Sequence, residues 1–214
     1  MAKKNSFTSI ITGDLVKSRN INSRQWLPAL KKILSAEGDS PKTWEIYRGD
    51  SFQIEVKDPS RAFLMAIRIK AAMKRIKQLD VRMAIGIGAK ESPRGKITES
   101  NGEAFVYSGR LLEDLIRQKQ NMAVRTPWPD FDRDMNLYIT LALIVMDHWS
   151  PSSSELVSIL TDYYAENKET LQTRLASKLK ITQSSVSARM KRAYYAEILE
   201  LLTWYEERIK TLLL

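Results

Sequence analysis

The sequence predicts an α+β unit followed by an all-α unit, and three observations lead to this fold class. Short β-branched runs alternate with amphipathic segments over the first 126 residues. Pro127 and Pro129 then interrupt the chain. From Arg133 onward, every segment repeats its apolar residues with a helical period. We therefore expect a mixed unit over residues 1–126 and a helical unit over residues 130–214.

The elements of the first unit follow from its apolar pattern and its turn residues. The predicted order is a strand at 6–12 ending in a loop at Gly13-Asp14, a helix at 22–36, a hairpin of two runs at 43–47 and 52–56, a helix from Pro59 to about Lys77, a strand at 81–89, a helix at 102–118 and a strand at 122–125. This order resembles a ferredoxin-like sandwich with helices on one face of the sheet.

The second unit contains a helix-turn-helix pattern at about residues 170–192. A short helix is predicted from Leu171 to Lys180, and Thr182 can cap a second helix that begins at Gln183. Small Ala176 permits the two helices to cross closely. The apolar residues expected to fill the wedge between them are Leu175, Leu179, Ile181, Val186 and Met190. Lys180 is a departure, because this motif commonly has glycine at the turn.

The same pattern predicts a DNA-binding surface. The residues expected to face base edges at the start of the second helix are Gln183, Ser184, Ser185 and Ser187, and the cap Thr182 is expected to belong to the same DNA-binding surface. The residues expected to contact phosphates are Lys178, Arg189, Lys191 and Arg192. The stretch resembles the DNA-binding part of sigma-factor region four over roughly residues 150–195. The alternative is an ordinary helical hairpin with a solvated basic face.

Composition agrees with a polyanionic partner and excludes several other classes. The formal net charge is +9 and the pI is about 9.6, and basic residues cluster between Lys168 and Arg192. The absence of cysteine excludes disulfide and thiolate chemistry. The longest apolar run, Ile139 to Met146, is too short to span a bilayer, and the N-terminus lacks an apolar signal segment. We expect a cytoplasmic protein with no membrane partner.

Three short elements of the first unit predict a second chemistry. They are the GDLVKS stretch after the first strand, the RGD sequence at the hairpin tip and the GEAFVYSGR stretch that opens a helix. In a ferredoxin-like sheet the first two lie side by side, so Asp14 and Asp50 could hold Mg²⁺ or Mn²⁺ over a nucleotide. The residues expected to contact that nucleotide are Gly13, Ser18, Arg48, Gly49 and Arg110. The alternative for both aspartates is turn chemistry, since Gly-Asp pairs are frequent in tight turns.

These elements resemble the catalytic domain of class III nucleotidyl cyclases, and more closely the SatD family of cyclase-like domains with a C-terminal helix-turn-helix. The resemblance implies that Asp14 and Asp50 bind metal, that Arg110 contacts the triphosphate and that a homodimer forms the site. Two departures weigh against cyclase turnover: Ile46 replaces a purine-selecting lysine, and Val106 replaces a ribose-orienting asparagine.

Three functions remain open at this point. The first is a DNA-binding transcriptional regulator whose cyclase-like unit senses a nucleotide or forms a dimer. The second is an active metal-dependent nucleotidyl cyclase or nucleotide transferase, with Arg110 as the catalytic arginine and the helical unit as an auxiliary. The third is a protein-interaction module that uses the apolar last helix, predicted from Arg192 to Leu214. The regulator is expected to be a dimer, because proteins of this kind commonly bind two half-sites.

Overall fold

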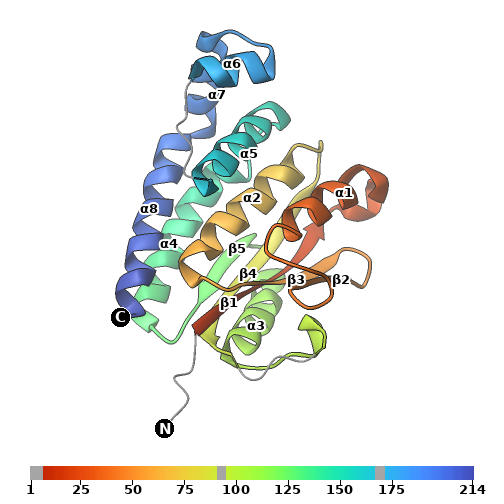
Figure 1. Ribbon diagram of the computed structural model, residues 1–214, viewed down its shortest axis with the longest axis vertical. Coiled ribbons are helices and arrows are strands. Elements are labelled where there is room, and N and C mark those ends of the chain that lie inside the picture. Colours follow the sequence, from red (N-terminus) through yellow and green to blue (C-terminus); the bar gives the residue numbers. More distant parts are fainter. Residues whose placement is uncertain (1–6, 91–94, 167–171) are drawn as a thin grey trace.

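The computed structural model describes residues 7–90, 95–166 and 172–214 (Figure 1). Within these ranges the chain combines a five-stranded sheet with helices, as expected for an α+β protein. The strands are β1 (Phe7–Val16), β2 (Trp44–Tyr47), β3 (Ser51–Val56), β4 (Asp80–Ala89) and β5 (Met122–Arg125), and their order across the sheet is β2-β3-β1-β4-β5. Neighbouring strands are antiparallel except β4 and β5, which are parallel.

The helices connect these strands and then continue to the C-terminus. Those within the sheet region are α1 (Ser23–Leu34), α2 (Ala62–Lys74) and α3 (Glu103–Gln118), with short 3-10 turns η1 (Ser18–Asn20), η2 (Pro59–Arg61) and η3 (Ile97–Glu99). The helices after β5 are α4 (Pro129–Met146), α5 (Pro151–Ala165), α6 (Gln172–Leu179), α7 (Gln183–Ala193) and α8 (Tyr195–Leu212). The last helix therefore begins after Tyr194, not at Arg192, because Tyr194 takes a left-handed conformation with φ 51°.

The first strand is longer than its sequence pattern predicts. β1 does not stop at Gly13-Asp14 but continues to Val16, and it is paired on both sides. Asp14 lies opposite Ser51 of β3 and Arg82 of β4. The prediction of a loop here was wrong, because hydrogen bonds from two neighbouring strands override the turn preference of a Gly-Asp pair.

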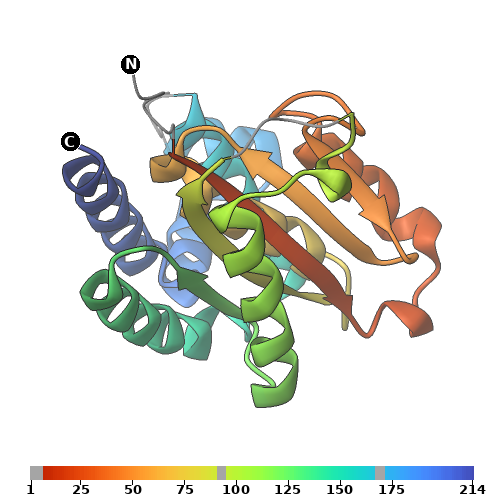
Figure 2. The same cartoon turned by 90° about the horizontal axis from the view of Figure 1, so that it is seen from below.

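Helices cover both faces of the sheet, and the prediction of helices on one face only was wrong. α3 lies on one face, α1 and α2 lie on the opposite face (Figure 2), and α4 lies beside the outer edge of β5. Alternate residues of β4 point to the two faces of the sheet. Ile85 belongs to the main core, whereas Ala84 packs with Leu111 and Leu115 of α3. α3 approaches β4 so closely that a Cβ added at Gly86 would lie 2.2 Å from the carbonyl oxygen of Ala104.

α5 and α8 pack on α2, and all the helices after β5 contribute to its hydrophobic core. One cluster of buried residues extends from Ile11 of β1 to Ile209 of α8. The buried Tyr205 hydroxyl of α8 donates to the carbonyl of Pro59 at 2.9 Å, and Arg61 contacts Glu206 at 3.3 Å. The division into units at residues 126 and 130 stays a prediction, but the apolar side chains on its two sides are buried together.

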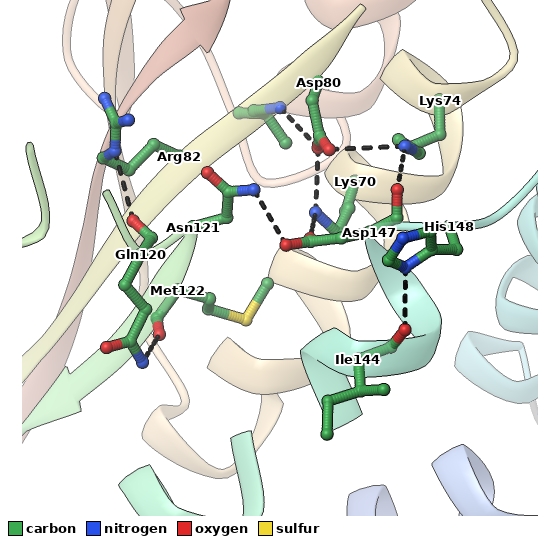
Figure 3. Close-up of polar contacts among 11 residues, drawn as sticks. Lys70, Lys74, Asp80, Arg82, Gln120, Asn121, Met122, Ile144, Asp147 and His148 are labelled. Atoms are coloured by element: carbon green, nitrogen blue, oxygen red, sulfur yellow. Dashed lines mark hydrogen bonds and ion pairs between the residues drawn. The ribbon is translucent and has the colours of Figure 1, made fainter. Parts of the chain in front are cut away.

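A buried cation joins the sheet to the end of α4 (Figure 3). Lys70 of α2 has a fully buried side chain, and its Nζ lies 2.8 Å from Asp80 Oδ1 and 2.6 Å from Asp147 Oδ1. Asn121, which precedes β5, donates to Asp147 Oδ2 at 3.0 Å. Because a buried charge is costly unless it is paired, these contacts fix where the last turn of α4 meets the sheet.

Among the described residues, the helices lack the combination of length and apolar character that crossing a membrane requires.

Candidate functional sites

The first candidate site is a pocket of about 710 Å³ beside the end of β1, the hairpin tip and the second half of α3. Four of the residues predicted from the sequence line it, namely Asp14, Ser18, Arg48 and Asp50. The other side chains around the pocket include cations, carboxylates and apolar groups: Lys17, Arg19, Arg82, Glu113, Tyr47, Leu112 and Ile116. The strand order places β1 next to β3, so residues 14 and 50 meet although 36 positions separate them in the sequence.

Asp14 is the buried carboxylate of this pocket. Its Oδ2 lies 3.3 Å from Arg82 NH1, whereas its Oδ1 is buried without a hydrogen-bond partner. Burial raises the pKa of Asp14, the Arg82 guanidinium opposes that rise and the Asp50 carboxylate adds to it. An unsatisfied carboxylate oxygen next to a second carboxylate is a suitable environment for a cation.

Asp50 is held at the hairpin tip by contacts with the segment after β1. Its Oδ2 accepts a hydrogen bond from Ser18 Oγ at 2.5 Å, and its carbonyl accepts one from the Leu15 amide at 3.1 Å. The tip turns through Arg48 and Gly49, whose φ values are 50° and 92°. Ser18 therefore orients Asp50, and Ser18 is itself a buried residue.

A metal ion at this site would depend on ligands beyond the two aspartates. Within the described part of the chain, no group of three or more His, Cys, Asp or Glu side chains could hold a metal ion. Mg²⁺ usually keeps several waters and binds through one or two carboxylates together with substrate phosphates. Asp14 and Asp50 fit that mode, and the cationic lining of the pocket suits a phosphate chain.

The second candidate site is the pair of helices α6 and α7. Lys180 ends α6 in a left-handed conformation with φ 53°, which explains why glycine is common at this turn. Thr182 caps α7, and its Oγ1 accepts a hydrogen bond from the Ser185 amide at 3.2 Å. Leu175 and Val186 are fully buried between the helices. The predicted Thr182 cap is therefore present, and the other three predicted apolar residues, Leu179, Ile181 and Met190, are half-buried. Residues 170 and 171, where the pattern was expected to begin, lie outside the described residues, as does Lys168.

The polar residues of this helix pair differ in how free they are to meet a ligand. Gln183, Ser187, Lys191 and Arg192 are exposed. The hydroxyls of Ser184 and Ser185 lie 2.9 Å from Thr182 Oγ1, within the cap. Lys178 is exposed, and its Nζ lies 5.1 Å from the centre of the Tyr163 ring.

Arg189 faces the body of the protein. Its side chain is only 20% exposed, and its NH1 lies 3.7 Å from Glu155 Oε2 of α5. Glu155 also lies 3.5 Å from Arg75 at the end of α2. Nearby, the Trp149 indole N–H donates to the carbonyl of Ala193 at 3.0 Å. These contacts connect α7 to the rest of the helical region.

Comparison with known families identifies the family of this chain. The sequence model of the SatD family matches residues 8–198, which include the sheet from Thr8 onward, the pocket and both helices α6 and α7. The chain belongs to the SatD family. A search of curated proteins found no match.

In this SatD-family protein, three of the predicted nucleotide contacts do not line the pocket. Arg110 lies on the exposed side of α3. Gly13 packs in the sheet, where an added Cβ would lie 2.6 Å from the Phe52 ring. Gly49 supplies the positive φ of the hairpin tip. The family resemblance assigned Arg110 to the triphosphate from its position in the sequence of α3. Whether its side chain faces the pocket depends on how α3 is rotated about its own axis.

Sequence reasoning missed Arg82, the arginine of this SatD-family pocket that contacts Asp14. Arg82 lies on β4, its side chain is mostly buried, and its Nε donates to the carbonyl of Gln120 at 3.1 Å while NH1 contacts Asp14. Its charge inside an otherwise apolar strand was the available signal. Its partner could not be identified without the antiparallel register that places residue 82 opposite residue 14.

Proposed function

We propose that this protein is a DNA-binding regulator in which α6 and α7 form a helix-turn-helix, and in which the pocket at Asp14 and Asp50 senses a nucleotide with Mg²⁺ or Mn²⁺. The observation that carries the first half is the geometry of α6 and α7. A left-handed residue at 180, a threonine cap at 182 and a buried Leu175–Val186 wedge are the local features that this motif needs. They occur in a chain with a net charge of +9.

The exposure pattern of α7 supports one orientation toward DNA. Its N-terminal residues Gln183 and Ser187 are exposed and carry side chains that can bind base edges. Lys191 and Arg192 follow on the same helix and suit phosphate oxygens. Arg189, which the sequence grouped with them, instead supports α7 through Glu155.

The unsatisfied Oδ1 of Asp14 supports the nucleotide-sensing half. A metal-bound nucleotide would place a divalent cation beside Asp14 and Asp50 and a phosphate chain among the basic side chains of the pocket. Arg82 is placed to contact those phosphates, in the role that the family resemblance gave to Arg110. The strand order β4-β1-β3-β2, with α1 and α2 in the crossovers, agrees with a ferredoxin-like or cyclase-like sheet.

A contiguous set of contacts would connect the two halves (Figure 3). Arg82 binds the carbonyl of Gln120, and the next residue, Asn121, binds Asp147 at the end of α4. A ligand that moves Arg82 away from Asp14 would also disturb residues 120 and 121, just before β5. The contact between Asn121 and Asp147, which holds the end of α4, would then change. Coupling of this kind requires a direct energetic test.

Fluorescence anisotropy with labelled duplex DNA tests the DNA half. Lys191→Ala combined with Arg192→Ala should weaken binding by at least tenfold, and should lower the slope of log K against log salt by about 2 if each residue contacts one phosphate. The matched control, Lys31→Ala with Lys32→Ala on α1, removes the same charge from another exposed helix. Equal losses in both double variants would show that binding follows net charge alone and would reject the α7 surface.

Active nucleotidyl transfer is the second candidate, and the two pocket carboxylates favour it. The purified protein is incubated with Mg²⁺ or Mn²⁺ and each nucleoside triphosphate, and pyrophosphate and cyclic product are measured. Product that disappears in Asp50→Ala would make this protein an enzyme with a DNA-binding appendage. Binding without product, measured by calorimetry in the same mixtures, supports the sensor.

A further inference from the structure

A second large cavity lies where α7 meets α8 (Figure 1). Its volume is about 740 Å³, and it shares no lining residue with the pocket at Asp14 and Asp50. Small-molecule sites in proteins usually have volumes of about 300–1,000 Å³. The walls come from the start of α5, the start of α6, the part of α7 after Ser187 and the start of α8. The cavity is therefore a product of the folded helical region.

Hydrogen bonds fix the corner between α7 and α8. Tyr194 is the single residue between the two helices, and it takes a left-handed conformation with φ 51°. Its amide donates to the Lys191 carbonyl at 3.1 Å. The indole N–H of the buried Trp149 donates to the carbonyl of the neighbouring Ala193 at 3.0 Å. The cavity is therefore preformed, as small-molecule sites usually are.

Two cations of α7 line this cavity without an acidic partner in the described part of the chain. Lys191 and Arg192 are exposed, and neither forms an ion pair with a carboxylate among those residues. Glu197 of α8 also lines the cavity but pairs with neither of them. An anion that enters the cavity can therefore form charge-assisted hydrogen bonds with Lys191 and Arg192 without breaking an existing ion pair.

The wall formed by α5 adds to this preference for an anion. It is the first turn of a 15-residue helix, and that turn contains no acidic residue. Ser150 caps the helix by accepting a hydrogen bond from the Ser153 amide at 3.2 Å, and both serines line the cavity. The positive end of a helix dipole attracts negative charge. The attraction of α5 thus reinforces that of the two cations.

Apolar groups complete the lining. Met190, Tyr194 and Ala196 belong to it, and Tyr194 is 51% exposed. An aromatic ring and a thioether can both cover an apolar body. The lining therefore suits an organic anion better than a bare inorganic ion.

We propose that this cavity binds a small organic anion, a carboxylate or phosphate on an apolar body, and that the bound anion competes with DNA. The competition follows from shared residues, because Ser187, Lys191 and Arg192 line the cavity and also belong to the proposed DNA-binding surface. A cation that is engaged by an anion in the cavity does not neutralise a DNA phosphate at the same time. The competition rests on the proposed DNA binding, whereas the anion site does not.

Isothermal titration calorimetry of the full chain without DNA tests the anion site. Benzoate and phenyl phosphate are the probes, because they carry the two anionic groups on the same ring. Benzyl alcohol lacks the charge, and inorganic phosphate lacks the ring. One organic anion should bind at least tenfold more tightly than both controls, and the tighter probe identifies the anionic group. Equal binding of inorganic phosphate would show an adventitious ion only, and absence of binding by both organic anions would overturn the site.

Two substitutions test the location of the bound anion. Arg192→Gln should weaken binding of the tighter probe at least tenfold, whereas Arg208→Gln, at an exposed position of α8 outside the cavity, should leave it unchanged. Tyr194→Gly removes the ring but keeps the corner, because φ 51° suits glycine, and it should also weaken binding. Equal affinities in the two arginine variants, or an unchanged affinity in Tyr194→Gly, would contradict this location.

Fluorescence anisotropy with labelled duplex DNA at constant ionic strength tests the competition. The tighter probe at ten times its dissociation constant should raise the apparent Kd for DNA about elevenfold. Tyr194→Gly should bind DNA like the unmodified protein but lose this effect, because Tyr194 is not part of the proposed DNA-binding surface. Anion binding without a change in DNA affinity would overturn the competition. A protein that binds no duplex would overturn it together with the proposed function, while calorimetry would still decide the anion site.

Discussion

Replacement of Lys70 by methionine should destabilise the protein by about 3 kcal/mol. Removing one partner of a buried ion pair typically costs about 3–5 kcal/mol, because the remaining charge is left without compensation. Here Lys70 is fully buried, whereas the side chains of Asp80 and Asp147 keep 14 and 30% exposure. Since both carboxylates retain some hydration, we expect the lower end of that range.

Chemical denaturation followed by tryptophan fluorescence and circular dichroism measures this change. Lys96→Met is the control, because Lys96 and Glu99 form an exposed pair at 3.7 Å that should contribute less than about 1 kcal/mol. A double-mutant cycle of Lys70→Met with Asp147→Asn should give a coupling above about 1 kcal/mol. A loss below 1 kcal/mol for Lys70→Met would refute the claim that this cation joins the sheet to α4.

Three further predictions concern the candidate sites. Lys180→Gly should stabilise the protein by about 1 kcal/mol because φ 53° suits glycine, whereas Lys178→Gly within α6 should cost about 1 kcal/mol. A Lys180→Gly variant that loses as much stability as Lys178→Gly in thermal unfolding would contradict the turn assignment. Burial raises the pKa of Asp14, so the folded state loses stability as pH rises through that pKa. Asp14→Asn should therefore be more stable than the unmodified protein at neutral pH, with the difference vanishing below about pH 3 in unfolding experiments. Mg²⁺ at tenfold its dissociation constant should add about 1.4 kcal/mol to the unmodified protein and nothing to Asp14→Asn.

Local patterns were sufficient to predict most elements of this fold. Alternating β-branched runs located the strands because their burial on the sheet requires a period of two. The Gly-Asp pair at residues 13 and 14 was the exception. Its local preference favours a turn, but the sheet extends through it, because β3 and β4 supply backbone partners on both sides of Asp14.

The candidate sites were predictable only where one segment carries the whole feature. The α6–α7 turn and its Thr182 cap depend on neighbouring residues, and both could be predicted. Whether Arg82 faces the pocket depends on the register of β1 and β4, and whether Arg110 does depends on the rotation of α3 about its axis. A single sequence specifies neither. The apolar run at 139–146 likewise does not reveal which of its residues other helices cover, and Leu141 and Ile144 within it are exposed.

Site-specific crosslinking from α7 tests the central claim most directly. Ser187→Cys, labelled with a photoreactive group, places the probe on the exposed N-terminal half of α7, and Lys32→Cys on α1 is the control. The account predicts an adduct with duplex DNA from residue 187 that declines with salt, and little or none from residue 32. Equal yields at both positions, or none at residue 187 under conditions where DNA binds, would contradict it.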